Sequence, residues 1–206
     1  MLVMKNKASG RSKAVFLDRD GTLIKLVYNP QTDSIDSVSK ASEVETMYDF
    51  PEVLRKLKDL GYLLIIVSNQ PRVGLKKLSK ETYEQIKKRV DEEFEKKGIV
   101  FDAQYYCLHH PWAEVAEYRK ECECRKPKIK FFQDAQKEFS IDLARSWTIG
   151  DGINDVLAGH NAGVRTILIG NNLEAGYLSI LQEQLKGVKP DFIVKKPKEI
   201  LKIITE

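Results

Sequence analysis

Three apolar runs of the chain each end on residues that could do chemistry. In chain order they lead into Asp18 and Asp20, into Ser68, and into Asp151. If the runs are parallel strands, their carboxyl ends meet at one edge of a sheet, which is where α/β proteins bind ligands. Carboxylates from different elements suit Mg²⁺, which prefers oxygen ligands. A lone Asp-x-Asp-Gly is also typical of a surface turn, but the ordered set favours a magnesium site.

All three cysteines lie in one polar segment of the chain. Cys107 and His109 form one short pair, and Cys122 and Cys124 form another. An odd number of cysteines cannot complete a disulfide framework, whereas structural zinc takes Cys₃His sets of this kind. A redox pair and chance clustering are the alternatives. Redox chemistry at Cys122 and Cys124 leaves Cys107 and His109 unused, so we favour zinc.

Strand and helix patterns alternate along the chain. Strands are expected at 14–17, 62–67, 101–107, 147–150, 164–169 and 191–194, and helices at 51–60, 79–97, 129–139 and 153–162. In the first helix Val53, Leu54, Leu57 and Leu60 recur at helical spacing, and Gly61 ends it. The alternation predicts an α/β fold, a Rossmann-like and mainly parallel sheet with helices on both faces.

Two long segments interrupt this alternation. Residues 24–48 form a polar connection rich in Ser and Asp, and residues 107–126 form the loop that carries the cysteines. Long loops in compact α/β domains are usually lids or binding loops. We expect zinc to staple the second loop, which is too polar to bury itself. The 206 residues predict one domain, 1–206, without a large cap domain.

The charge of the chain points to a small anionic partner. Lys and Arg number 34 against 30 Asp and Glu, a net +4, which is weak grounds for nucleic acid. The clusters 87–89 and 195–196 are typical of solvated faces, and no basic strip interleaved with aromatics accompanies them. The longest apolar run, 62–67, is far short of the ~20 residues that cross a bilayer. We expect a cytoplasmic protein without membrane or nucleic-acid partners, and favour a monomer.

From about residue 14 to 170, these ordered motifs resemble the haloacid dehalogenase superfamily of phosphohydrolases. The resemblance implies that Asp18 is the nucleophile that forms an aspartyl phosphate, and that Asp20 is the general acid and base. Ser68 and Lys126 would hold the phosphoryl oxygens. Mg²⁺ would bind Asp18, Asp151 and the backbone carbonyl of Asp20.

The cysteine segment narrows the resemblance. The sequences 107–111 (CLHHP) and 122–128 (CECRKPK) are similar to the zinc-loop phosphatases, whose members act on heptose bisphosphate or histidinol phosphate. The resemblance implies that Arg19, Asn69, Gln70 and Arg125 bind substrate. Zinc would fix the backbone beside Arg125 and Lys126 and direct both cations at the phosphate.

The substrate pocket departs from the family pattern. Gly152 stands where heptose-phosphatases commonly have Lys, residues 71–75 read PRVGL, and 24–48 is longer than typical. The leading expectation is a Mg²⁺-dependent phosphatase of carbohydrate metabolism that removes the 7-phosphate from D-glycero-D-manno-heptose 1,7-bisphosphate. Histidinol phosphate and 3′-phosphorylated polynucleotides are alternative substrates. A non-enzymatic phosphate-binding protein is disfavoured, because binding alone does not need Asp20 as an acid.

Overall fold

The computed structural model of the chain describes residues 11–30, 33–170 and 183–205. A six-stranded parallel sheet has the order β5-β4-β1-β6-β7-β8. Its strands are β1 (Lys13–Leu17), β4 (Tyr62–Asn69), β5 (Ala103–Cys107), β6 (Trp147–Gly150), β7 (Arg165–Ile169) and β8 (Phe192–Val194). The helices are α1 (Phe50–Asp59), α2 (Lys80–Glu95), α3 (Lys130–Phe139), α4 (Ile153–Ala162) and α6 (Glu199–Thr205). The predicted fold class is confirmed.

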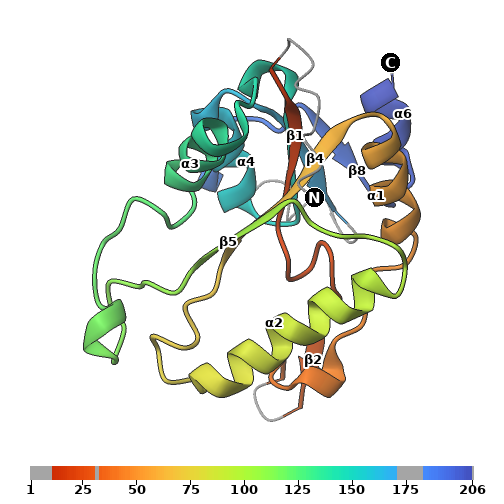
Figure 1. Cartoon of the computed structure of the whole chain (residues 1–206). Coiled ribbons are helices and arrows are strands. Elements are labelled where there is room, and N and C mark those ends of the chain that lie inside the picture. Colours follow the sequence, from red (N-terminus) through yellow and green to blue (C-terminus); the bar gives the residue numbers. More distant parts are fainter. Residues whose placement is uncertain (1–10, 31–32, 171–182, 206) are drawn as a thin grey trace, which may run out of the picture.

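Alternate residues of each strand build two separate cores. In β1, Val15 and Leu17 pack with α1, α2 and α6, whereas Ala14 and Phe16 pack with α3 and α4. Successive side chains of a strand point to opposite faces, so one apolar run supplies both cores. Figure 1 shows α3 and α4 on one side of the sheet and α1 and α6 on the other.

The central position of β1 creates the site. β1 lies between β4 and β6, and the Asp18 amide donates a hydrogen bond to the Ile149 carbonyl at 3.0 Å. From β1 the chain passes to β4 and β5 on one side and later to β6, β7 and β8 on the other. Ligands bind at such a reversal of strand order. The carboxyl ends of β1, β4 and β6 therefore form one rim.

The helix ends largely follow the predicted signals. Ser79 caps α2, because its side chain accepts a hydrogen bond from the Thr82 amide at 3.0 Å. Gly61 follows α1 with a φ of 81°, a conformation that favours glycine. The prediction for Leu60 was wrong: α1 ends at Asp59, and the Leu60 side chain is 41% exposed.

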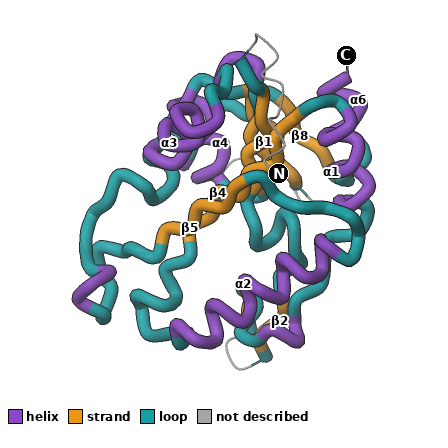
Figure 2. Tube along the Cα trace, viewed as in Figure 1, coloured by secondary structure: helices purple, strands orange, loops and turns teal. Residues whose placement is uncertain are grey.

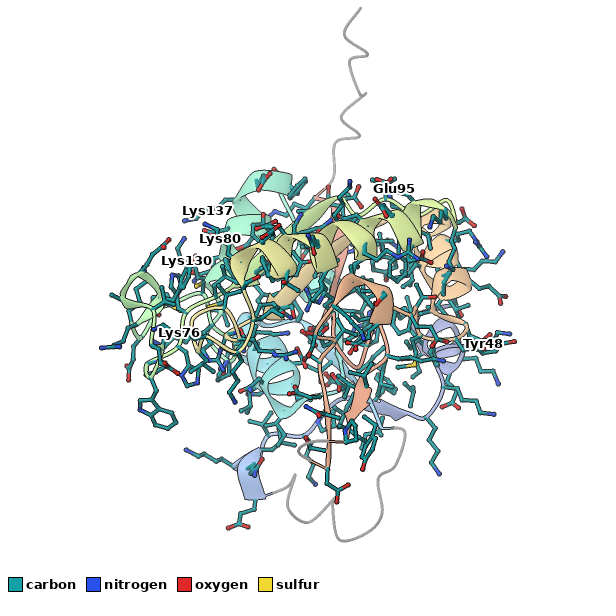
Figure 3. The ribbon with its side chains drawn as sticks, turned by 90° about the horizontal axis from the view of Figure 1, so that it is seen from below. Tyr48, Lys76, Lys80, Glu95, Lys130 and Lys137 are labelled. Carbon is teal, nitrogen blue, oxygen red and sulfur yellow. The ribbon has the colours of Figure 1, made fainter. Side chains whose placement is uncertain are left out.

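The connection 24–48 contains structure that the sequence did not predict. A small antiparallel hairpin pairs β2 (Val27–Asn29) with β3 (Ser34–Asp36), and the 3₁₀ turn η1 (Ala41–Glu43) follows. We call residues 27–36 the hairpin. Near the end of this connection Tyr48 is 79% exposed and projects from the molecule (Figure 3).

The long loop between β5 and α3 extends away from the sheet (Figure 2). It contains the cysteines and the 3₁₀ turn η2 (Ala116–Tyr118). Within the described ranges, no helix is long and apolar enough to cross a membrane.

Candidate functional site

A cavity of about 230 Å³ opens at the carboxyl ends of β1, β4 and β6. Its walls combine the predicted chemical residues with neighbours from the hairpin connection and the start of α4. They are Asp18, Asp20, Leu26, Ser37, Ser68, Asn69, Lys126, Asp151, Gly152, Asn154 and Asp155. The three strand ends and Lys126, two residues after Cys124, therefore converge as the sequence predicted.

Lys126 is the only lysine or arginine that lines this cavity among the described residues, and it is 4% exposed. Its Nζ donates to Asp18 Oδ1 at 2.7 Å, to Asp155 Oδ1 at 2.5 Å and to the Val67 carbonyl at 2.6 Å. Burial opposes the charge, but Asp155 and Asp18 raise the pKa of Lys126 above its usual value. Lys126 is therefore a fixed ammonium beside the Asp18 carboxylate.

The acidic residues outnumber this single cation. Carboxylate oxygens of Asp18, Asp151 and Asp155 lie within 4.8 Å of one another. Burial first, and then repulsion from Asp18 and Asp155, raises the pKa of Asp151 to about 7. Crowded carboxylates with surplus negative charge are stabilised by a divalent cation. The oxygen-only donor set fits Mg²⁺.

The turn after β1 brings Asp151 into place. Gly21 has a φ of 78°, and a Cβ at this position would collide with the Asp151 carboxylate. Thr22 donates from its hydroxyl to Asp151 Oδ1 at 3.3 Å. The Gly-Thr pair therefore provides both space and a hydrogen bond for this carboxylate.

Arg19 and Gln70, which were predicted to bind substrate, both donate hydrogen bonds to the Asp20 carboxylate. Arg19 donates from Nε to Asp20 Oδ1 at 3.0 Å and from Nη2 to Oδ2 at 2.9 Å. Gln70 donates from Nε2 to Asp20 Oδ2 at 2.6 Å and accepts from Arg19 Nη2 at 2.7 Å. Burial raises the pKa of Asp20, but Arg19, Gln70 and Ser37 outweigh it and hold that pKa below its usual value.

Neither Arg19 nor Gln70 lines the cavity, and their side chains are 2% and 4% exposed. Both hydrogen-bond to Asp20 and to each other, Gln70 also donates to the Ser68 hydroxyl, and Arg19 lies over the Tyr106 ring. The predicted contact of these two residues with substrate stays a prediction. The geometry instead favours a role in fixing the orientation of Asp20.

Asn69 connects β4 to the segment that carries Lys126. Its Oδ1 accepts from the Lys126 amide at 3.0 Å, and its Nδ2 donates to the Lys126 carbonyl at 3.0 Å. The neighbouring Ser68 is 2% exposed, and its hydroxyl accepts from Gln70 Nε2 at 3.1 Å. Ser68 and Asn69 both line the cavity, so Asn69 both faces the cavity and fixes Lys126.

The four predicted zinc ligands form a compact cluster. The Sγ atoms of Cys107, Cys122 and Cys124 are separated by 3.2–3.4 Å, and His109 Nδ1 lies 3.3 Å from Cys124 Sγ. A disulfide requires about 2.05 Å between sulfurs, and all three cysteines are free. Three sulfurs and one imidazole nitrogen are a donor set that fits structural zinc.

The loop that carries these ligands also has a small apolar core, which the sequence prediction missed. Ala113 and Tyr118 are 1% and 7% exposed and pack with Val73 and Tyr83. The amides of residues 114 and 115 donate to the Gly74 carbonyl at 2.8 and 3.0 Å. The expectation that this loop is too polar to bury itself was wrong, because it packs against residues 73–78.

Arg125 lies in a second cavity of about 470 Å³. Its wall contains several cations and shares Lys126 and Asn154 with the first cavity. The lining residues are Pro111, Lys120, Glu121, Cys122, Arg125, Lys126, Pro127, Lys128 and Asn154. Arg125 therefore lines a cavity that adjoins the acidic cavity, and Lys126 lies between the two.

Sequence reasoning did not select three wall residues: Leu26, Ser37 and Asn154. Leu26 and Ser37 come from the connection 24–48, where no periodic pattern marks a particular position. Asn154 follows the predicted metal ligand Asp151 by three residues, and this place at the start of α4 is the signal that could have identified it.

Comparison with known proteins agrees with this geometry. Residues 123–199 match the family described as HAD-hydrolase-like. The D-glycero-beta-D-manno-heptose-1,7-bisphosphate 7-phosphatase of Haemophilus ducreyi is 41% identical over 159 residues, covering 75% of this chain and 80% of that protein. The protein of the same name from Photorhabdus laumondii is 32% identical, covering 85% of this chain and 96% of that protein.

Solved structures share the fold. The D,D-heptose 1,7-bisphosphate phosphatase of B. bronchiseptica, complexed with magnesium and phosphate, has a TM-score of 0.69 and 22% identity, covering 93% of this chain and 99% of that one. A HAD-like phosphatase from Mesorhizobium loti has the same TM-score and identity, and 90% of each chain is covered. The chain thus belongs to the haloacid-dehalogenase-like phosphatases, in the family of the D-glycero-beta-D-manno-heptose-1,7-bisphosphate 7-phosphatases.

Proposed function

We propose that the chain is a Mg²⁺-dependent phosphatase that removes the 7-phosphate from D-glycero-D-manno-heptose 1,7-bisphosphate. The observation that carries this proposal is the Asp18 carboxylate, paired with Lys126 at 2.7 Å inside the acidic cavity. The names of the relatives supply the substrate. In this proposal residues 1–206 act as one domain, with the loop 107–126 as its zinc-bound part.

The carboxylates of Asp18 and Asp151 and the backbone carbonyl of Asp20 would hold Mg²⁺. Three observations support this set: the oxygen-only donors, the surplus negative charge and the raised pKa of Asp151. When bound, Mg²⁺ neutralises charge on the phosphoryl oxygens. It also relieves the repulsion between Asp18 and Asp151.

Asp18 acts as the nucleophile in the first half of the reaction. One carboxylate oxygen bonds to phosphorus while the bond from phosphorus to the sugar oxygen breaks. Asp20 must carry a proton at this step, although Arg19, Gln70 and Ser37 hold its pKa below the usual value in the free protein. It donates that proton to the departing sugar oxygen, which leaves as an alcohol. The products of this half are the heptose 1-phosphate, with a free hydroxyl at position 7, and an aspartyl phosphate on Asp18.

Water completes the cycle in the second half. Asp20, now a carboxylate, removes a proton from a water molecule as its oxygen bonds to phosphorus. The phosphorus–Asp18 bond breaks, inorganic phosphate leaves, and Asp20 is protonated again. Arg19 and Gln70 keep the Asp20 carboxyl aimed at the cavity through both proton transfers.

The phosphoryl oxygens are bound by Ser68, Asn69 and Lys126 in this mechanism. Lys126 is already a desolvated ammonium 2.7 Å from the nucleophile. A preorganised cation in a water-poor site stabilises the transition state without reorganising at the moment of reaction. Arg125, in the adjoining cavity, recognises the part of the substrate that remains outside the acidic cavity.

Cys107, His109, Cys122 and Cys124 would hold zinc as a structural metal. Cys124 directly precedes Arg125 and Lys126 in the chain, so the metal would anchor the backbone next to both cations. Thiols in this set must stay reduced. We therefore also propose a cytoplasmic location, and a monomer as the active form.

A substrate panel with Mg²⁺ tests the proposal. Heptose bisphosphate should give a kcat/KM at least ~100-fold above histidinol phosphate, other sugar phosphates and 3′-phosphorylated oligonucleotides. Comparable low activity on every compound would contradict the specific substrate. Preference for oligonucleotides, with affinity that falls steeply with salt, would favour nucleic-acid end repair instead.

A further inference from the structure

Two residues that line the acidic cavity come from the connection 24–48, which is not part of the sheet. Leu26 and Ser37 flank the hairpin and line the cavity with Asp20. Their position depends on how the connection 24–48 is fastened to the rest of the molecule. Only a fixed wall can distinguish one leaving group from another.

Backbone hydrogen bonds fasten the base of this connection. The Lys25 amide donates to the Glu45 carbonyl at 2.9 Å, and the Met47 amide donates to the Leu23 carbonyl at 2.9 Å. These bonds join the beginning of the connection to its end. They do not hold its middle, residues 37–39, against the loop that follows β4.

Val38 is buried in the main core, and the Ser39 amide donates to Glu43 Oε2 at 2.8 Å. Arg72 fastens this part to the loop after β4. Its Nη1 donates to the Ser37 carbonyl at 2.7 Å and to the Val38 carbonyl at 2.9 Å, and its Nη2 donates to Ser39 Oγ at 2.8 Å. One planar guanidinium thus contacts three consecutive residues, a geometry that a lysine cannot reproduce.

The environment of Arg72 indicates that its orientation is set by these contacts. Its Nε is buried and has no hydrogen-bond partner among the described residues, an arrangement that costs free energy. The Lys77 and Leu78 amides donate to the Arg72 carbonyl at 2.8 and 3.2 Å. The backbone of Arg72 is therefore fixed in a tight turn while its side chain reaches the connection.

The same short segment also reaches the proposed acid. Gln70, two residues before Arg72, donates to Asp20 Oδ2 at 2.6 Å. Residues 70–72 therefore contact the carboxyl that would protonate the leaving group and the wall that would face that group. Residues 71–75 depart from the family pattern, and the contact of Arg72 with residues 37–39 gives that departure a physical consequence.

We propose that Arg72 is a positioning residue that fastens residues 37–39 and thereby fixes the wall of Leu26 and Ser37 against the sugar of the substrate. This inference rests on the proposed function, because it assigns the wall to the leaving group of the hydrolysed phosphomonoester. Arg72 touches no reacting atom. Its loss loosens sugar recognition and leaves Asp18, Lys126 and the metal ligands in place.

The test combines hydrogen exchange with kinetics on Arg72→Met, Arg72→Lys and the control Lys77→Ala. Lys77 is exposed and belongs to the same loop, so the control removes the same charge without touching residues 37–39. In Arg72→Met, amides of 34–39 should exchange at least ~10-fold faster while those of β1 and β4 keep their rates. KM for heptose bisphosphate should rise ~10-fold with kcat within ~3-fold.

Arg72→Lys should give an intermediate exchange rate and KM, because an ammonium replaces only part of the fork. If Arg72→Met does not fold, the exchange rates and KM of Arg72→Lys are compared with those of the wild-type protein instead. Unchanged exchange at 34–39 together with unchanged KM would overturn the proposal. Absence of phosphatase activity in the wild-type protein would overturn the proposed function, and the exchange experiment would still decide whether Arg72 fastens the connection.

Discussion

Lys126 sets the charge of the acidic cavity at the scale of single residues. It pairs with Asp18 and Asp155 while it is 4% exposed. Asp151 has no such cation within the described site, and its pKa rises to about 7. One lysine beside three carboxylates leaves an excess of negative charge, which the proposed Mg²⁺ would neutralise.

Arg19 is expected to act through Asp20 and not on the substrate. Arg19→Met removes two hydrogen bonds from the Asp20 carboxyl. The pKa of Asp20 should rise, because Arg19 lowers it, but the carboxyl loses its fixed orientation, so proton transfer to the leaving oxygen should suffer. A sugar alkoxide needs that proton, whereas p-nitrophenolate leaves without it. We predict that kcat falls ~100-fold on a sugar phosphate and less than ~5-fold on p-nitrophenyl phosphate.

Steady-state kinetics on both substrates measure this difference, with Arg165→Met as the control. Arg165 lies over the Trp147 ring at 3.7 Å on the sheet, away from the cavity lining. Equal losses on both substrates in Arg19→Met would mean that Arg19 supports the phosphoryl site as a whole. A rise in KM alone would restore its predicted role in substrate binding.

The sequence predicted which site residues converge better than it predicted which way they point. Asp18, Ser68 and Asp151 follow from strand ends, because parallel strands end at one edge. The direction of Arg19 does not follow, since its neighbour Asp20 and the distant Gln70 compete with solvent for the guanidinium. That competition is decided by tertiary packing, which no local pattern records.

At the scale of elements, the turn after β1 determines whether Asp151 can approach Asp18. Gly21→Ala should weaken Mg²⁺ binding at least ~10-fold, because the new Cβ would collide with the Asp151 carboxylate. Gly61→Ala is a matched control, since its φ of 81° is close to the 78° of Gly21 and nothing lies within 4 Å of its Cβ. Both variants carry the same backbone strain.

Isothermal titration with MgCl₂ separates the two effects. Both variants should lose thermal stability through the same backbone strain, Gly21→Ala more than Gly61→Ala because of the collision, and Gly21→Ala alone should lose metal affinity. Equal metal affinity in the two variants would show that the close approach of residue 21 to Asp151 does not contribute to the magnesium site.

The zinc loop is the second element that positions cations. Cys122→Ser should reduce zinc from about one per chain to a small fraction, because structural zinc uses four protein ligands. Activity should fall ~10- to 100-fold as the backbone beside Arg125 and Lys126 loosens. Metal analysis and kinetics on the purified variant measure both quantities.

Glu123→Gln is the control for the zinc loop. Glu123 lies between two cysteines and is 75% exposed in an ion pair with Lys128, which contributes little to stability. This variant should retain zinc and activity. Wild-type protein without zinc, and with Cys122 and Cys124 joined in a disulfide, would support the redox alternative.

Elements with an apolar run and clear end signals were predictable, and the shortest strands were not. The helix expected at 153–162 is α4 at Ile153–Ala162, and the strand expected at 147–150 is β6 at Trp147–Gly150. The strands β2 and β3 have three residues each, too few to establish an alternating pattern. The sequence therefore indicated only a polar connection.

At the scale of the whole molecule, pH should control magnesium binding. Metal binds the ionised form of Asp151, whose pKa is raised to about 7. Protons therefore compete around and below that pH, and the apparent Kd for Mg²⁺ should weaken about 5-fold between pH 7 and about pH 6, then continue to weaken. Above about pH 8 the affinity should level off. Titrations across this range measure the effect.

The same pKa shift has a consequence for stability without metal. A raised carboxyl pKa means that the folded chain binds a proton more tightly than the unfolded chain between about pH 4 and 7. Acidification through this window should therefore raise the melting temperature of the metal-free protein, and saturating Mg²⁺ should suppress the rise. A melting temperature that falls from pH 7 to pH 5 without metal would contradict the crowded acidic site.

The central claim is that the converged strand ends make Asp18 a nucleophile. The enzyme is mixed with substrate and Mg²⁺ and quenched rapidly in acid, and its peptides, kept in acid to preserve an aspartyl phosphate, are analysed by mass spectrometry. We predict phosphate on the peptide that contains Asp18, formed and lost within one turnover, and no turnover above ~10⁻⁴ of wild type in Asp18→Asn. Full turnover by Asp18→Asn, or phosphate on a different peptide, would contradict the account.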